Sequence, residues 1–188
     1  MLCFDIETGG ISPTSVVLSA SILYFDPREK LTYQQLLDST FFIKFNVVDQ
    51  LQRLKRTTDK STLDWWNTQS DYARKINLIP TKTDVTVETG LQLLNKYVKS
   101  YPESSIIWAR GSMDEAIITN LYQTVDIEMP VKYNQWRDIR TAVDILYGST
   151  NGYCDVEHPE FNKDMVIKHL PYHDVCYDVM MLLYGKEK

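Results

Sequence analysis

The chain has 188 residues, of which 44% are hydrophobic and 24% charged, and its formal net charge is −5 at pH 7. This length and apolar content suit one buried core, so we expect a single domain over residues 1–188. The acidic balance excludes a protein that coats nucleic acid through charge alone.

Strands are predicted first along the chain, and helices later. Residues 2–7, 15–25 and 40–45 predict three strands that form an antiparallel meander. Strands and helices then alternate, and the pattern indicates an α/β protein with a mixed central sheet flanked by helices. The first predicted helix has Ser61 as its N-cap, the second covers 87–98, and the third begins at Ser112 after a strand at 104–109. A short strand then leads into a fourth helix, which ends at Gly148. The last helix covers about 173–184.

Two acids interrupt the apolar pattern of the first strand. Asp5 and Glu7 would share one face of the strand, ~7 Å apart, opposite Phe4 and Ile6. Carboxylates on a strand inside a sheet are costly unless a cation neutralises them. The plain alternative is an exposed edge strand with a polar face, followed by a glycine turn.

Two more acids and a histidine stand out further along the chain. Asp114 lies in the first turn of a helix that follows a strand, where Ser112 and Glu115 also form a capping-box pattern, so its role could be structural. Asp178 lies at the edge of the apolar stripe of the last helix, so its carboxylate needs a partner. His173, five residues earlier, could reach the same cleft. The pattern is therefore Asp-x-Glu, an isolated Asp, and His-x4-Asp.

In this order, the motifs resemble the DEDDh branch of the DnaQ-like 3′–5′ exonucleases, which have a ribonuclease H-like fold. Residues 61–75, 108–118 and 134–143 are closely similar to the exonuclease A proteins of T-even bacteriophages. The same segments are more distantly similar to the mycobacterial ribonuclease AS group. The similarity extends from Phe4 to Tyr184, which is nearly the whole chain.

The resemblance implies a two-metal mechanism on a ribonuclease H-like fold with three antiparallel N-terminal strands. Two ions, Mg²⁺ or Mn²⁺, would generate hydroxide and stabilise charge on the phosphate. Asp5, Glu7 and Asp178 would hold one ion, and Asp5 with Asp114 would hold the other. His173 would be the general base that takes a proton from the attacking water.

Other residues are candidates for binding the substrate. By the same resemblance, Thr8 and Gly9 follow the first motif because the backbone must approach the terminal nucleotide closely. Trp65 and Trp66 could stack on unpaired bases, but adjacent side chains of a helix point ~100° apart, so at least one belongs to the core. Arg110 is a candidate for contact with a substrate phosphate.

Two groups of residues leave more than one interpretation open. The basic run at 53–60 is either a solvated loop or a landing surface for phosphates. Cys154-x3-His158 and His169-x3-His173 could suggest a zinc site, although a proline interrupts the second pair. His169 could also take the role of general base if His173 only caps the helix.

Together these features predict a 3′–5′ exonuclease that hydrolyses single-stranded DNA or RNA, with DNA favoured, from a free 3′ end to nucleoside monophosphates. The alternatives are an exoribonuclease and a catalytically silent nucleic-acid-binding or polymerase-associated protein of the same fold. Four acids and a histidine favour the enzyme, because a binding module needs no metal ligands.

The same sequence predicts where the protein acts. No apolar run approaches the ~20 residues of a membrane span, and the start lacks a signal-peptide pattern. The three cysteines form no CxxC pair, which favours reduced thiols. We therefore expect a cytoplasmic protein with no membrane partner, in the host cytoplasm if it is phage-encoded.

Overall fold

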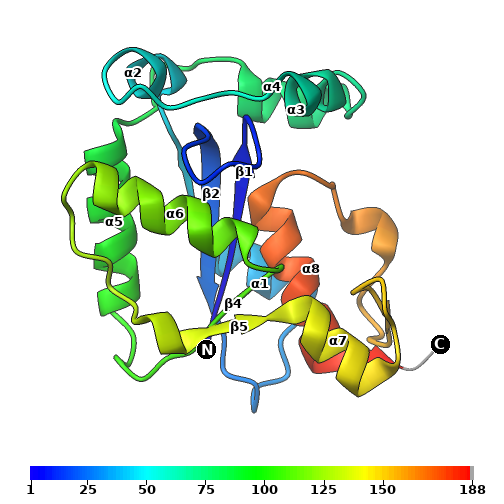
Figure 1. The fold of residues 1–188 in the computed structure, drawn as a ribbon. Helices are drawn as coiled ribbons and strands as arrows, with labels where there is room; N and C mark the ends of the chain where they lie inside the picture. Colours follow the sequence, from blue (N-terminus) through cyan, green and yellow to red (C-terminus); the bar gives the residue numbers. More distant parts are fainter. Residues whose placement is uncertain (187–188) are drawn as a thin grey trace.

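A five-stranded mixed sheet lies at the centre of the computed structural model, which describes residues 1–186 (Figure 1). Its strands are β1 (Leu2–Thr8), β2 (Val17–Tyr24), β3 (Phe41–Lys44), β4 (Ile107–Ala109) and β5 (Trp136–Asp138). They lie in the order β3-β2-β1-β4-β5. The β1/β2 and β2/β3 pairs are antiparallel, whereas β4 runs parallel to both β1 and β5. The predicted mixed sheet with three antiparallel N-terminal strands is confirmed.

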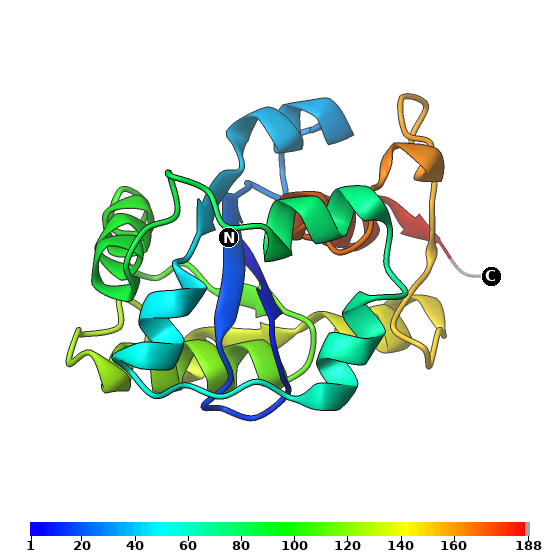
Figure 2. The same cartoon turned by 90° about the horizontal axis from the view of Figure 1, so that it is seen from above.

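Helices cover both faces of this sheet (Figure 2). The helices are α1 (Tyr33–Ser39), α2 (Val47–Gln52), α3 (Lys60–Trp66), α4 (Asp71–Leu78), α5 (Val87–Lys99), α6 (Met113–Thr124), α7 (Ile139–Tyr147) and α8 (Pro171–Tyr184), with 3-10 turns η1 (Tyr133–Gln135) and η2 (Lys163–Met165). A short ribbon pairs β6 (Asp155–Val156) with β7 (Gly185–Lys186). None of the helices described is long and apolar enough to cross a bilayer.

Two early helices differ from the sequence-based expectation. The connection between β2 and β3 contains α1, which begins with a capping box between Thr32 and Gln35 that the sequence analysis missed. The helix expected after Ser61 begins two residues earlier, at Lys60, because Asp59 and not Ser61 is its N-cap. Ser61 lies inside α3, and its hydroxyl donates to the Asp59 carboxylate at 3.2 Å.

The later helices agree better with expectation. Gly148 ends α7 with a φ of +64°, a conformation that glycine adopts without strain. Ser112 precedes α6 as expected, but within the described structure its side chain makes no capping hydrogen bond, so the predicted capping box with Glu115 is wrong. The last helix begins at Pro171, two residues before the expected start, and proline suits the first position of a helix.

Each face of the sheet packs a separate apolar cluster. Phe4 and Ile6 of β1 belong to the cluster under α5 and α6, whereas Cys3 belongs to the cluster under α8. Because side chains alternate along a strand, Asp5 and Glu7 share the face of Cys3 and point toward the α8 side. The two faces predicted for the first strand are therefore confirmed, and the acids lie between β1 and α8.

Candidate active site

The sheet topology brings Asp114 to the acids of β1. Cys3 pairs with Trp108 in the parallel β1/β4 ladder, so the chain leaves β4 close to Asp5. Helix α6 begins a few residues later, and Asp114 lies in its first turn with only 3% of its surface exposed. Asp5 is half-buried and Glu7 is 8% exposed. Asp114 is thus brought to the two carboxylates of β1 at one end of the sheet.

The carboxylates at this end of the sheet perturb one another strongly. Burial raises the pKa values of Asp5 and Glu7 well above the usual range, and the neighbouring charges of Asp114 and Asp174 raise both further. Burial also raises the pKa values of Asp114 and Asp174 to about 7, with Asp178 as the strongest neighbouring charge in each case. A bound cation would favour the ionised form of each group and so lower these pKa values.

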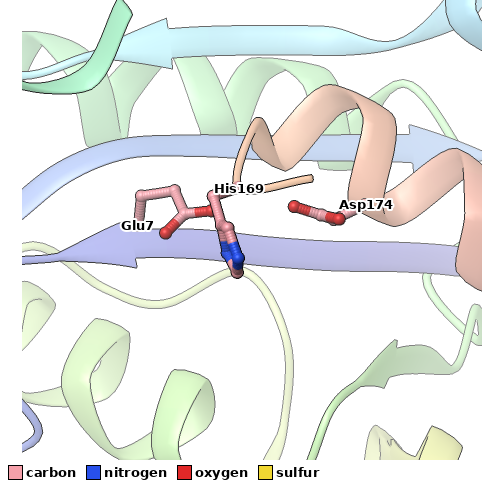
Figure 3. Close-up of side chains that lie close together, drawn as sticks. All are labelled: Glu7, His169 and Asp174. Carbon is pink, nitrogen blue, oxygen red and sulfur yellow. The ribbon is translucent and has the colours of Figure 1, made fainter. Parts of the chain in front are cut away.

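Glu7, His169 and Asp174 are the residues best placed to hold a metal ion (Figure 3). Glu7 comes from β1, His169 from the segment before α8 and Asp174 from the first turn of α8. One ligand atom from each lies within 4.8 Å of the other two. Across residues 1–186 this is the one group of three or more His, Cys, Asp and Glu side chains at such spacing.

The expected pair, His173 and Asp178, has partners inside the protein instead. The Nδ1 atom of His173 lies 2.6 Å from the hydroxyl of Tyr33 in a buried contact. Asp178 is 1% exposed, and its Oδ1 accepts from Nε of Arg110 at 2.8 Å and pairs with Nη2 at 2.5 Å. Its Oδ2 has no hydrogen-bond partner among the residues described. These contacts hold both side chains inside the protein, and neither belongs to the group formed by Glu7, His169 and Asp174.

His169 has the chemistry of a proton acceptor. Burial lowers its pKa below the usual range, and the charge of Lys168 lowers it further. A lowered pKa keeps the imidazole neutral near pH 7, and only the neutral ring can accept a proton. The ring lies edge-on to Trp65, with centroids 4.7 Å apart. Burial lowers the pKa of His173 as well, so what separates the two rings is their position: His169 lies beside Glu7 and Asp174, whereas His173 contacts Tyr33.

The guanidinium of Arg110 is engaged within the protein. Besides its two contacts with Asp178, its Nη1 donates to the carbonyl of Gly152 at 2.8 Å. Its central carbon also lies 4.1 Å from the centre of the Tyr153 ring. These contacts occupy its donors and weigh against a contact with a substrate phosphate.

The two tryptophans of α3 have different environments. Trp66 is fully buried, and its Nε1 donates to the carbonyl of Thr8 at 2.9 Å, whereas Trp65 is 41% exposed. The expectation that at least one of them belongs to the core is confirmed. Trp65 lines a pocket of about 360 Å³ beside Glu7. The other residues of the pocket are Ile6, Thr8, Ile11, Ser61, Thr62 and Met113.

Gly9 and Gly10 allow two segments of the protein to approach closely. A Cβ atom on Gly9 would lie 2.6 Å from Cγ2 of Val16, and one on Gly10 would lie 2.5 Å from Oγ of Ser15. The carbonyl of Gly9 accepts from the backbone N–H of Asp59 at 2.8 Å. These glycines therefore hold the turn after β1 against the start of α3, which places Thr8 and Trp65 near each other.

The groups left open by the sequence are largely structural. In the basic run, Arg53 pairs with two acids, Lys60 pairs with Asp64, and Arg56 is buried and donates to backbone carbonyls. The proposed zinc site does not form in the described part of the chain, where neither Cys154 nor any other cysteine belongs to a cluster of potential metal ligands.

Sequence reasoning considered His169 only as an alternative base and missed Asp174, because the chain contains two overlapping His-x4-Asp frames. His169 precedes Asp174 by the same interval that separates His173 from Asp178. Pro171 is the signal that could have separated them. As the first residue of α8 it leaves His169 ahead of the helix and Asp174 in the first turn, where side chains reach the end of the sheet.

Similarity to known proteins extends over nearly the whole chain. The family model described as 3′-5′ exoribonuclease Rv2179c-like domain matches residues 1–182. The exodeoxyribonuclease of Enterobacteria phage T4 is 30% identical over 201 aligned residues, which cover 96% of this chain and 86% of that protein. The resemblance stated from the motifs is confirmed. The chain belongs to the Rv2179c-like 3′–5′ exoribonuclease family and is a 3′–5′ exonuclease that acts on nucleic acid.

Proposed function

We propose that this chain hydrolyses single-stranded nucleic acid from a free 3′ end, DNA in preference to RNA, and releases nucleoside monophosphates. The observation that carries the proposal is the cluster of Glu7, His169 and Asp174 beside two further carboxylates, the half-buried Asp5 and the buried Asp114. The preference for DNA is supported by the similarity to the phage exodeoxyribonuclease. RNA is the second candidate, because the family model is that of an exoribonuclease. The enzyme would act in a cytoplasm, that of the host if it is phage-encoded.

Asp5, Glu7, Asp114 and Asp174 are suited to hold two divalent ions, Mg²⁺ or Mn²⁺. Carboxylate oxygens are the hard ligands that such ions prefer. The raised pKa values of all four groups fit this role, since cations would let them ionise together at neutral pH. When bound, the ions would supply a nucleophile at neutral pH and stabilise the charge that develops on the phosphate.

His169 would act as the general base that takes a proton from the attacking water and not as a metal ligand, because a ring nitrogen that binds an ion cannot accept that proton. Its neutral imidazole lies beside Glu7 and Asp174, where the reacting phosphate must approach the carboxylates. We therefore assign catalysis to His169 and Asp174 and a supporting role to His173 and Asp178. The sequence analysis assigned the motif to the latter pair, although both pairs have the same spacing.

The pocket beside Glu7 would receive the terminal nucleotide. Its wall combines the exposed ring of Trp65 with the apolar side chains of Ile11 and Met113, which are 69% and 39% exposed. An aromatic ring and apolar side chains can stack on a nucleobase of any sequence. The backbone of Thr8 and Gly9 would approach the sugar end of the same nucleotide. Trp66, which is buried, would only support this wall.

The proposal is tested with end-labelled single-stranded DNA, single-stranded RNA and duplex DNA, each incubated with Mg²⁺ or Mn²⁺. We expect mononucleotides to be released from the 3′ end, fastest from single-stranded DNA, and no release in the presence of EDTA. A substrate with a blocked 3′ terminus should resist hydrolysis. Cleavage of a circular single strand, or release of a 5′ label first, would contradict the proposal.

The variant Asp174→Asn serves as the control for contaminating nucleases. It keeps the shape of the side chain and removes one anionic ligand. If it degraded all substrates at the wild-type rate, the activity would not come from this site. Faster hydrolysis of RNA than of DNA would make the second candidate, an exoribonuclease, the correct one.

A further inference from the structure

The backbone of His169 has a conformation that a histidine rarely adopts. Its φ is +61°, in the left-handed region where a side chain with a Cβ atom is strained. Strain of this kind persists only where the surrounding structure imposes it, and it occurs often at functional sites. Contacts to the His169 backbone therefore decide where its imidazole lies.

One buried side chain holds that backbone. Asn77 of α4 is 1% exposed, and its Nδ2 donates to the carbonyl of His169 at 2.8 Å and to the carbonyl of Ala73 at 3.1 Å. Its Oδ1 accepts from the hydroxyl of Ser19, a fully buried residue of β2, at 2.5 Å. The orientation of the amide is fixed by these partners, because carbonyl oxygens can only accept. Asn77 thus links the central sheet and α4 to residue 169.

The imidazole is confined on its other side by the rings of α3. Trp65 and Trp66 both meet it edge-on, with centroid distances of 4.7 Å and 6.4 Å. With the carbonyl held by Asn77 and the ring held by the tryptophans, the side chain of His169 has little freedom to leave Glu7.

We propose that Asn77 is a positioning residue for catalysis, which holds His169 in its left-handed conformation and so aims the imidazole at the carboxylate cluster. This inference rests on the proposed function, in which His169 is the general base. Asn77 acts through His169 and touches neither the carboxylates nor the substrate. Without the amide donor, residue 169 leaves its left-handed conformation, and the imidazole moves away from Glu7 and Asp174.

The test compares Asn77→Leu, which keeps the branching of the side chain and removes every hydrogen bond, with Gln50→Leu. Gln50 is the matched control, because its buried amide binds the backbone of Val17 at 2.9 Å and 2.7 Å on the same strand as Ser19. We expect Asn77→Leu to lower kcat by about tenfold to a hundredfold, as small misplacements of catalytic groups do, with KM nearly unchanged. Gln50→Leu should keep the kcat of its folded fraction. Asn77→Asp retains the shape of the side chain without the donor and gives the same test if the leucine variant does not fold.

A double-mutant cycle with His169→Ala separates positioning from general destabilisation. If Asn77 acts through His169, adding Asn77→Leu to His169→Ala should change kcat by less than about twofold. An equal loss in both backgrounds, or a wild-type kcat for Asn77→Leu and Asn77→Asp while His169→Ala is slow, would overturn the inference. A wild-type kcat for His169→Ala would instead show that the proposed function has the wrong base, and the inference would fall with it.

Discussion

The start of α8 carries the His-x4-Asp motif twice, and the aspartates of the two motifs lie on successive turns with different surroundings. At the start of α8, His169 and Asp174 lie beside Glu7 at the end of the sheet. In the other pair, His173 of the first turn contacts Tyr33, and Asp178, one turn further along, is paired with Arg110 in the interior. The spacing within each pair is identical, so sequence distance does not distinguish them.

The difference between the two turns lies in how each negative charge is balanced. Asp178 has a buried guanidinium of its own, which offsets the burial that raises its pKa to about 6. Asp174 lies among other carboxylates, and its pKa is raised to about 7. A carboxylate whose counter-charge is built into the protein is structural, whereas one that needs a cation from outside is suited to a metal site.

The largest effect that separates the two turns should come from their aspartates. Asp174→Asn should lower kcat by roughly 10³-fold or more, because a ligand worth several kcal/mol of charge stabilisation is lost. Its melting temperature should stay level or rise, since one of several repelling carboxylates is gone. Initial rates on single-stranded DNA at saturating Mg²⁺ and thermal melts measure both effects.

Asp178→Asn should have the opposite effects, with a large loss of stability and a small loss of kcat. The variant leaves the buried Arg110 without its counter-charge, which costs about 3–5 kcal/mol of stability, while the folded enzyme should keep kcat within about tenfold. Replacing both members, as Arg110→Met with Asp178→Leu, should recover much of that stability. If Asp178→Asn lost as much turnover as Asp174→Asn at equal fractions folded, the two turns would not differ in role.

A smaller effect is expected at Trp65, the ring that connects His169 to the pocket. Trp65→Ala should raise KM for single-stranded DNA about tenfold, because stacking on a base contributes ~1–3 kcal/mol. Trp65→Phe retains an aromatic face and should recover most of the affinity. An unchanged KM for the alanine variant would show that the base does not bind against this ring.

The last prediction concerns how the free energy of unfolding depends on pH when no metal is bound. Asp114 and Asp174 have folded-state pKa values of about 7, above the ~4 of an unfolded chain, so folding binds protons between these values. In EDTA their contribution to stability is full below about pH 4 and is lost as pH rises to about 7. Each kcal/mol lost corresponds to about 2–4 °C in a chain of this size.

Thermal melts from pH 4 to pH 8 test this dependence. The wild type in EDTA should lose more stability over that window than Asp174→Asn does, and the difference between the two isolates the titration of this residue. Millimolar Mg²⁺ should reduce the loss, because bound cations stabilise the ionised carboxylates. Identical pH profiles for the two proteins, or no response to Mg²⁺, would contradict the electrostatic account.

The sequence was sufficient for much of the fold. Alternation in β1 separated Phe4 and Ile6 from Asp5 and Glu7, and Gly148 marked the end of α7, because such signals are local. The convergence of Asp5, Glu7 and Asp114 came from a family resemblance, and the parallel pairing of β1 with β4 now gives it a structural reason.

What the sequence could not supply were contacts between distant segments. The partner of Asp178 is Arg110, 68 residues away, and the partner of His173 is Tyr33, 140 residues away. The contact between Asn77 and His169 spans 92 residues. Such pairings depend on how helices pack over the sheet, and a single chain carries no local pattern for them.

The most direct test of the account compares kcat against pH for His169→Ala and His173→Ala at saturating Mg²⁺. We expect the kcat of His169→Ala to be about 10²–10⁴-fold lower than that of the wild type. The rate of this variant should also no longer rise with pH, because the general base that produces the rise is missing. His173→Ala should keep kcat within a few-fold and retain that rise, while its melting temperature falls because the hydroxyl of Tyr33 loses its buried partner. A His173→Ala enzyme that loses both turnover and the pH dependence, beside a His169→Ala enzyme that keeps them, would contradict the assignment.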